Sequence, residues 1–151
     1  MKKILILAGL MVVSAVTAQA QTVMPLYAEG KAGKWVKGQF AIRNEGITPL
    51  PVSVEPRQLQ IINGKGAFGA LQPGTTVELP DTSAVIPPRG IRSFDFRIHC
   101  DNDCMIVFLN GMVTGKTKDG VLVKLWLPSS VYLCNEPKGC RDRTKKAAGL
   151  P

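Results

Sequence analysis

Polar and apolar side chains alternate with a period of two along most of the chain after residue 20. The clearest case is IRSFDFRIHC, where Phe94, Phe96 and Ile98 share one face while Asp95 and Arg97 share the other. Alternation of this kind predicts half-buried strands whose apolar face is turned toward a core, rather than helices. Shorter stretches with the same pattern lie at residues 36–43, 50–54, 59–61, 77–79 and 121–127.

Two stretches depart from simple alternation. CMIVFLNGMV, residues 104–113, is apolar on both faces, which predicts a central strand covered on both sides. Prolines at 49, 51 and 56 interrupt LPVSVEP, and proline cannot donate to a strand ladder. We therefore expect that strand to lie at a sheet edge or to carry bulges.

Turn chemistry separates these stretches, as in Asn44-Glu45-Gly46 and Pro87-Pro88-Arg89-Gly90. Residues 64–73 carry the weakest pattern and are expected to form a loop, and no stretch after residue 20 has a helical face. About seven short strands in a chain of this size predict an all-β fold, an immunoglobulin-like antiparallel β-sandwich. A small closed barrel is the alternative.

The N-terminus has the anatomy of a bacterial-type signal peptide. A positive Met1-Lys2-Lys3 precedes an apolar run over residues 4–16 and an Ala18-Gln19-Ala20 cleavage pattern. The apolar run is shorter than the roughly 20 residues that span a bilayer. We expect cleavage before Gln21, no membrane span afterwards, and a periplasmic or secreted protein. The predicted organisation is a signal peptide at 1–20, one sandwich at 21–134 and a basic tail at 135–151.

Four cysteines follow the predicted signal, and an even number in an exported chain predicts disulfides. Neighbouring pairs, Cys100–Cys104 and Cys134–Cys140, require the least reorganisation of the chain. Pairing of Cys100 with Cys134 is a rival that would join the start of one late strand to the end of the next. The sequence leaves the pairing open.

Positive charge gathers near the C-terminus. Loss of Lys2 and Lys3 with the signal lowers the formal net charge from +8 to +6. A basic tail with few apolar residues is usually solvated or disordered, although it could also form a patch for an acidic partner or an anionic surface. No nucleic-acid recognition motif is found. The tail contains Lys138, Arg141, Arg143, Lys145 and Lys146, against Glu136 and Asp142.

The chain offers little for catalysis or metal binding. His99, its single histidine, precedes Cys100, and adjacent strand residues point to opposite faces. Asp101 and Asp103 in CDNDC fall short of the six to eight oxygens that calcium takes. The cysteine spacing there is C-x-x-x-C rather than the redox motif C-x-x-C. We expect a non-enzymatic protein with no catalytic residue, no metal and no cofactor.

Four segments together resemble the N-terminal, immunoglobulin-like domain of the PapD-like periplasmic pilus-assembly chaperones. They are GQFAIRNEGITPLPVSVEP, SAVIPPRGIRSFDFRI, IVFLNGMVTG and GVLVKLWLPSSVYLC, and the match runs from Met24 to about Cys134. The resemblance implies a last strand that is lent to a partner, with main-chain hydrogen bonds and alternate side chains making the contact. The same alternation would also serve the strand's own core. The candidate partner-binding residues are Val121, Leu122, Val123, Lys124, Leu125 and Trp126.

The chain departs from the family in two respects. The family has a second domain, and this chain ends where that domain should begin. The family also holds its client's terminal carboxylate with an Arg and a Lys, which align near Met24-Pro25 and Ser129-Ser130, where no residue is basic. The leading hypothesis is a monomeric, non-enzymatic protein-interaction module or accessory chaperone that acts by β-strand addition in pilus or surface-structure assembly, with a pilin-like subunit as its candidate protein partner. The alternative is a pilin-like or surface structural subunit that itself receives a strand and is unstable alone.

Overall fold

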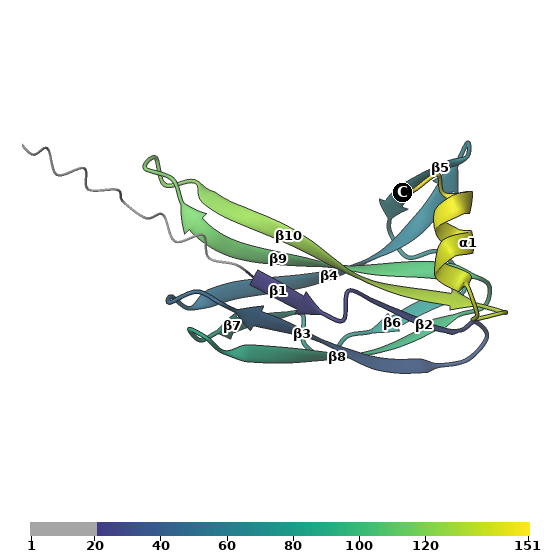
Figure 1. The fold of residues 1–151 in the computed structure, drawn as a ribbon, viewed down its shortest axis with the longest axis horizontal. Coiled ribbons are helices and arrows are strands. Elements are labelled where there is room, and N and C mark those ends of the chain that lie inside the picture. The colour runs from purple at the N-terminus through teal and green to yellow at the C-terminus, as the bar shows by residue number, and fades with distance from the viewer. Residues whose placement is uncertain (1–20) are drawn as a thin grey trace, which may run out of the picture.

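Strands make up most of residues 21–151, the part of the chain that the computed structural model describes (Figure 1). The predicted signal peptide, residues 1–20, lies outside the described residues. The all-β prediction is confirmed. The elements are β1 (Gln21–Met24), β2 (Tyr27–Lys31), β3 (Val36–Asn44), β4 (Leu50–Ile62), β5 (Lys65–Gly69), β6 (Thr75–Glu78), β7 (Ser83–Ile86), β8 (Ile91–Cys100), β9 (Cys104–Lys116), β10 (Leu122–Cys134) and α1 (Cys140–Ala147).

The strands form two facing sheets (Figure 1). The first has the order β1-β3-β8-β6, and the second has the order β2-β10-β9-β4-β5, with β7 also paired to β4. All pairs are antiparallel except β2 with β10. The predicted immunoglobulin-like sandwich is confirmed. The structure has more than the predicted seven strands for two reasons. The N-terminal strand is divided into β1 in one sheet and β2 in the other, and the short strands β5, β6 and β7 lie at sheet edges.

Four phenylalanines join the two sheets at the centre of the sandwich. The ring centroid of Phe40 lies 5.4 Å from that of Phe94 and 5.2 Å from that of Phe108, and Phe96 lies 5.0 Å from Phe108. A Cβ at Gly38 would lie 2.3 Å from the Phe96 ring, so glycine is needed for this close approach. The inward positions predicted for β3 and β8 are thereby confirmed, because these phenylalanines are at most 5% exposed.

Strand β9 is the most buried strand of the second sheet, between β10 and β4. Its inward residues, among them Phe108 and Met112, belong to the main core. Its outward residues Met105 and Val107 belong to a second cluster on the outer face. The prediction of a central strand covered on both faces is confirmed.

The prediction that β4 lies at an edge or carries bulges is wrong. β4 pairs with β9 on one side, and with β7 and then β5 on the other, without a shift in register. Residues 65–69, expected to lie in a loop, form β5 of a hairpin with β4. The turn of this hairpin places Asn63 and Gly64 at φ 52° and 72°, which the Asn-Gly pair favours in two-residue hairpins.

The prolines of β4 fit because each faces a place where no ladder bond is needed. The Val54 N–H donates to Thr82 O, 2.8 Å away, on the β7 side. Alternate residues of a strand face the same side, so Pro56 faces that side too, between the segments paired to β7 and β5. Pro51 faces the β9 side, but the ladder with β9 begins one residue later, at Val52.

Asn44 organises the turn after β3. It is 1% exposed, and its Nδ2 donates to Thr48 O at 2.7 Å and to Ile86 O and Pro87 O at 3.1 Å. Its Oδ1 accepts a hydrogen bond from Gly46 N at 2.9 Å. One amide side chain thus supplies bonds that the backbone of the turn lacks, and it joins the end of β3 to the β7–β8 connection.

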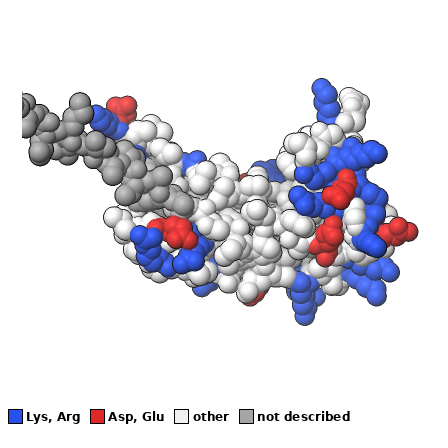
Figure 2. All heavy atoms as spheres, viewed as in Figure 1, with Lys and Arg blue, Asp and Glu red and all other residues white. Residues whose placement is uncertain are grey.

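The tail at 135–151 contains the helix α1, which the sequence pattern did not predict. Lys and Arg side chains gather at this end of the molecule (Figure 2). The helix is too short to show apolar periodicity, and helices of this length are marginal alone. Packing on the outer face of the second sheet stabilises it. The cluster there contains Leu59, Met105, Val107, Tyr132, Cys134, Cys140 and Ala148.

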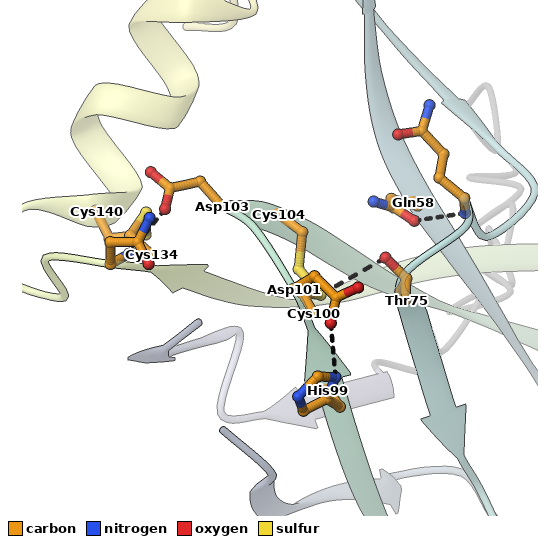
Figure 3. Close-up of a disulfide and its surroundings, with 11 residues drawn as sticks. Gln58, Thr75, His99, Cys100, Asp101, Asp103, Cys104, Cys134 and Cys140 are labelled. Carbon is orange, nitrogen blue, oxygen red and sulfur yellow. Dashed lines mark hydrogen bonds and ion pairs between the residues drawn. A yellow bond between two sulfur atoms is a disulfide. The ribbon is translucent and has the colours of Figure 1, made fainter. Parts of the chain in front are cut away.

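Both disulfides join cysteines that are neighbours in the sequence (Figure 3). Cys100–Cys104 closes the turn between β8 and β9, and Cys134–Cys140 attaches α1 to the end of β10. The rival pairing of Cys100 with Cys134 does not occur. Among residues 21–151 no helix is long and apolar enough to cross a membrane.

Replacement of Phe40 by alanine should lower the free energy of unfolding by about 3–5 kcal/mol, because the cavity would lie between both sheets. Urea unfolding followed by circular dichroism measures the change. Phe68→Ala is the matched control: Phe68 is 45% exposed, and its loss should cost less than about 1 kcal/mol. Equal losses in the two variants would contradict the assignment of Phe40 to the centre of the core.

Candidate functional site

Strand β10 is paired along its whole length on one side and along part of its length on the other. β9 pairs with it from Leu122 to Leu133. β2 pairs with it only from Ser130 to Cys134. Among residues 21–151, no strand pairs with the second side of residues 122–129, which we call the free edge.

One backbone hydrogen bond shows which groups the free edge presents. The Ser130 N–H donates to Leu26 O at 2.9 Å, on the β2 side. Alternate residues face the same side, so Lys124, Trp126 and Pro128 face the free edge. The edge therefore offers the N–H groups of Lys124 and Trp126 and the carbonyl groups of all three. Pro128 has no N–H, as is tolerated at an edge.

The predicted partner-binding residues lie on this segment and are exposed. The end of the β9–β10 hairpin diverges from the rest of the sandwich (Figure 1), and side chains on both of its faces are exposed. The alternation over 121–127 serves the protein's own core only at Leu127, which packs against it. The exposed fractions are 62% for Val121, 56% for Leu122, 46% for Val123, 39% for Leu125 and 46% for Trp126, and Lys124 is exposed as well.

Trp126 lies across the outer face of the sheet. It is opposite Gly111 in the register of β9, and a Cβ at Gly111 would lie 2.8 Å from the indole ring. The Lys124 Nζ lies 6.0 Å from the ring centroid. Glycine thus allows the ring to contact the strand beneath it, while nearly half of the side chain faces solvent.

A groove of about 470 Å³ borders the free edge. It opens between β1 of the first sheet and β10 of the second. Most of its lining is apolar, so unpaired backbone and an apolar hollow lie side by side. The lining residues are Gln21, Thr22, Val23, Met24, Leu26, Leu127, Pro128 and Ser130.

The two positions where the family's basic anchor residues would align lie next to each other. Ser129 Oγ donates to Pro25 O at 3.0 Å, although the residues are 104 positions apart. Neither position carries a positive charge. Sequence reasoning singled out these positions but missed the groove beside them. Two features of the sequence could have indicated this groove: the apolar residues on both sides of Pro25, and the proline Pro128 within the last strand.

The candidate polar residues at the disulfide end have partners within the protein (Figure 3). His99 Nδ1 lies 3.6 Å from Asp101 Oδ1, and Cys100 is bonded to Cys104 and 1% exposed. Asp103 accepts a hydrogen bond from Asn135 N at 2.7 Å and so joins two turns. Within residues 21–151, no three His, Cys, Asp or Glu side chains are grouped so that they could hold a metal ion.

No protein-family model and no curated protein matches the sequence. Solved structures do match the fold. One is a chain of the CsuC–CsuE chaperone–tip adhesion subunit pre-assembly complex from archaic chaperone–usher Csu pili of Acinetobacter baumannii, with a TM-score of 0.57 and 12% identity over 86% of this chain. Another is the class 5 fimbriae chaperone CfaA, with a TM-score of 0.56 and 11% identity over 78%.

A third match is SSP-19, an MSP-domain-like protein of Caenorhabditis elegans, with a TM-score of 0.52 and 7% identity over 75% of this chain and 98% of that one. The present chain spans 65% of the chain from the Csu complex and 57% of CfaA. Identities this low establish the fold alone. The resemblance drawn from the sequence is confirmed at that level: the chain has an immunoglobulin-like sandwich, with the same fold as part of these pilus and fimbriae chaperone structures.

Proposed function

We propose that this protein is an exported, non-enzymatic interaction module that binds an extended segment of a protein partner along the free edge of β10. The observation that carries the proposal is the unpaired backbone of residues 122–129 beside exposed apolar side chains. Partner strands bind such edges through main-chain hydrogen bonds, and alternate side chains supply selectivity.

The free edge carries little of the protection that edge strands usually have. Natural edges avoid unwanted pairing by lysines, prolines, bulges or short length. Here Lys124 and Pro128 interrupt a segment that otherwise exposes Val121, Leu122, Val123, Leu125 and Trp126, and the register shifts only between Val123 and Lys124. An exposed apolar edge of this length fits a surface that is covered by a partner.

The groove indicates the chemistry of that partner. A strand added to the free edge would continue the line of β2 along β10. Its side chains on the inner face would then enter the groove lined by Val23, Met24 and Leu127. The partner segment is therefore extended, with apolar residues at alternate positions.

We assign the protein, within this class, to assembly of pili or another surface structure, as an accessory chaperone in the periplasm with a pilin-like partner. The fold is shared with pilus chaperones, and two disulfides accord with an oxidising compartment. With no basic residue at Met24-Pro25 or Ser129-Ser130, the site lacks the charge-assisted anchor for a terminal carboxylate. An internal segment of the partner fits this edge better than its end.

The groove also favours a second candidate, a surface subunit that receives a strand from another protein. Such a subunit would be incomplete alone, so the purified protein would melt at low temperature and self-associate. An accessory chaperone would be a stable monomer. Size-exclusion chromatography and thermal melting of the chain from Gln21 onward separate the two.

Trp126→Pro should weaken partner binding by roughly 10- to 100-fold, because it removes a free-edge N–H and leaves the partner's acceptor unpaired. The ladder with β9 should survive, since residue 126 faces away from β9 and Pro128 already occupies the equivalent position. A photo-crosslinker at position 124 in periplasmic extract identifies the partner, whose affinity is then measured by biolayer interferometry.

Trp126→Ala is the matched control for this experiment, because it removes the ring but keeps the N–H. Leu125→Pro is unsuitable, since residue 125 faces β9 and its replacement would disrupt the hairpin itself. If Trp126→Pro binds the partner as tightly as Trp126→Ala does, main-chain pairing at the free edge is not the mode of binding.

Amide hydrogen exchange should alternate along β10 in the isolated protein. The Trp126 N–H faces solvent and the Leu127 N–H faces β9, so Trp126 should exchange faster by roughly 100-fold or more after correction for intrinsic rates. NMR of the uniformly labelled protein resolves the two amides. Similar protection of both would mean that the edge is already covered, and partner binding should slow exchange at Trp126 selectively.

A further inference from the structure

Lys and Arg side chains gather at the end of the molecule that carries α1, with several Asp and Glu side chains among them (Figure 2). Among the described residues, the salt bridges involve Arg43, Arg57, Arg92, Arg97 and His99. No carboxylate pairs with the lysines of this end. These lysines are Lys65, Lys138, Lys145 and Lys146.

Exposed apolar side chains occupy the same end. The β4–β5 hairpin projects from the sandwich beside α1 (Figure 1), and Ile61, Ile62 and Phe68 on it are 51%, 56% and 45% exposed. Lys65 follows the turn of this hairpin. The hairpin is held in place because β5 pairs with β4 and also contacts the C-terminal segment.

The C-terminal segment fixes the helix against this hairpin. Gly66 N donates to Ala148 O at 2.9 Å, and Leu150 N donates to Lys145 O at 2.9 Å. A Cβ at Gly66 would lie 3.0 Å from that of Ala148, so the two segments are in close contact. The helix lysines and the hairpin therefore belong to one rigid end of the molecule, which we call the basic–apolar end. Ile61 and Phe68 share the hairpin face that meets the C-terminal segment, whereas Ile62 and Lys65, opposite each other in the register, lie on the other face near the tip.

We propose that the basic–apolar end binds the surface of a membrane that contains anionic phospholipid, independently of the strand-addition function. Lysines near such a surface are attracted to lipid phosphates, and apolar side chains at a projecting tip enter the interface. A soluble polyanion would satisfy the lysines but would leave Ile61, Ile62 and Phe68 in water. The combination of charge and apolar exposure therefore favours lipid.

The proposed lipid surface and the free edge lie at opposite ends of the molecule. The tip of the β9–β10 hairpin and α1 lie toward opposite ends of the long axis (Figure 1). Attachment through the basic–apolar end would therefore leave residues 122–129 of β10 accessible to a partner. The two activities can be tested separately.

The test is co-sedimentation of the chain from Gln21 onward with vesicles of phosphatidylcholine, with and without phosphatidylglycerol. We expect binding only to vesicles with phosphatidylglycerol, and weaker binding as salt concentration rises. Lys65→Glu with Lys146→Glu should lower the partition coefficient by roughly 10-fold or more. Ile62→Ser should lower it by about 5-fold.

Lys116→Glu with Lys118→Glu is the control at the opposite end, because it changes the net charge by the same amount. It should lower binding by no more than about 2-fold, the part that is due to net charge alone. Circular dichroism and thermal melting verify that each variant is folded. The proposal is overturned if wild-type protein does not bind these vesicles or if the control pair weakens binding equally.

Unchanged vesicle binding by Ile62→Ser, combined with displacement by heparin, would identify a polyanion site and overturn the lipid assignment. Trp126→Pro should bind vesicles like the wild type. A failure at the basic–apolar end is therefore distinguishable from a failure of strand addition.

Discussion

The crossing of the chain from one sheet to the other at Pro25 determines which edges of the sandwich are covered. β1 pairs with β3 in the first sheet, and β2 pairs with β10 in the second. A strand has two sides, and β9 occupies one side of β10 throughout. Because β1 belongs to the opposite sheet, the first strand covers β10 only from Ser130 onward. The free edge and the adjacent groove both result from this division.

Alternation in the sequence was sufficient to predict the strands that face the core, because burial on one face requires a period of two. Phe94 and Phe96 on β8 and the doubly buried β9 follow directly from it. The position of β4 did not follow, because a proline excludes only the bond on its own side. The interruption opposite Pro56 depends on where β5 and β7 end. The helix α1 was missed because contacts distant in sequence stabilise it.

The candidate residues from Val121 to Trp126 and the absence of basic anchors were visible in the sequence. The exposure of these residues and their geometry were not. The sequence could not indicate which N–H and carbonyl groups of β10 face the free edge. The hydrogen bond from Ser130 N to Leu26 O reveals their orientation. Nor could the sequence bring Pro25 and Ser129 into contact across the whole domain. Both facts depend on register, which pairing between strands fixes.

Pro128 limits the number of main-chain hydrogen bonds that an added strand can form with β10. Along the outward side of β10, only Lys124 and Trp126 can donate before the series of donors is interrupted. A bound segment forms few main-chain hydrogen bonds, each contributing about 1 kcal/mol. Most of its affinity must therefore come from side-chain contacts. Contacts of this kind dissociate readily, which is what the proposed chaperone function would require and a permanent structural joint would not.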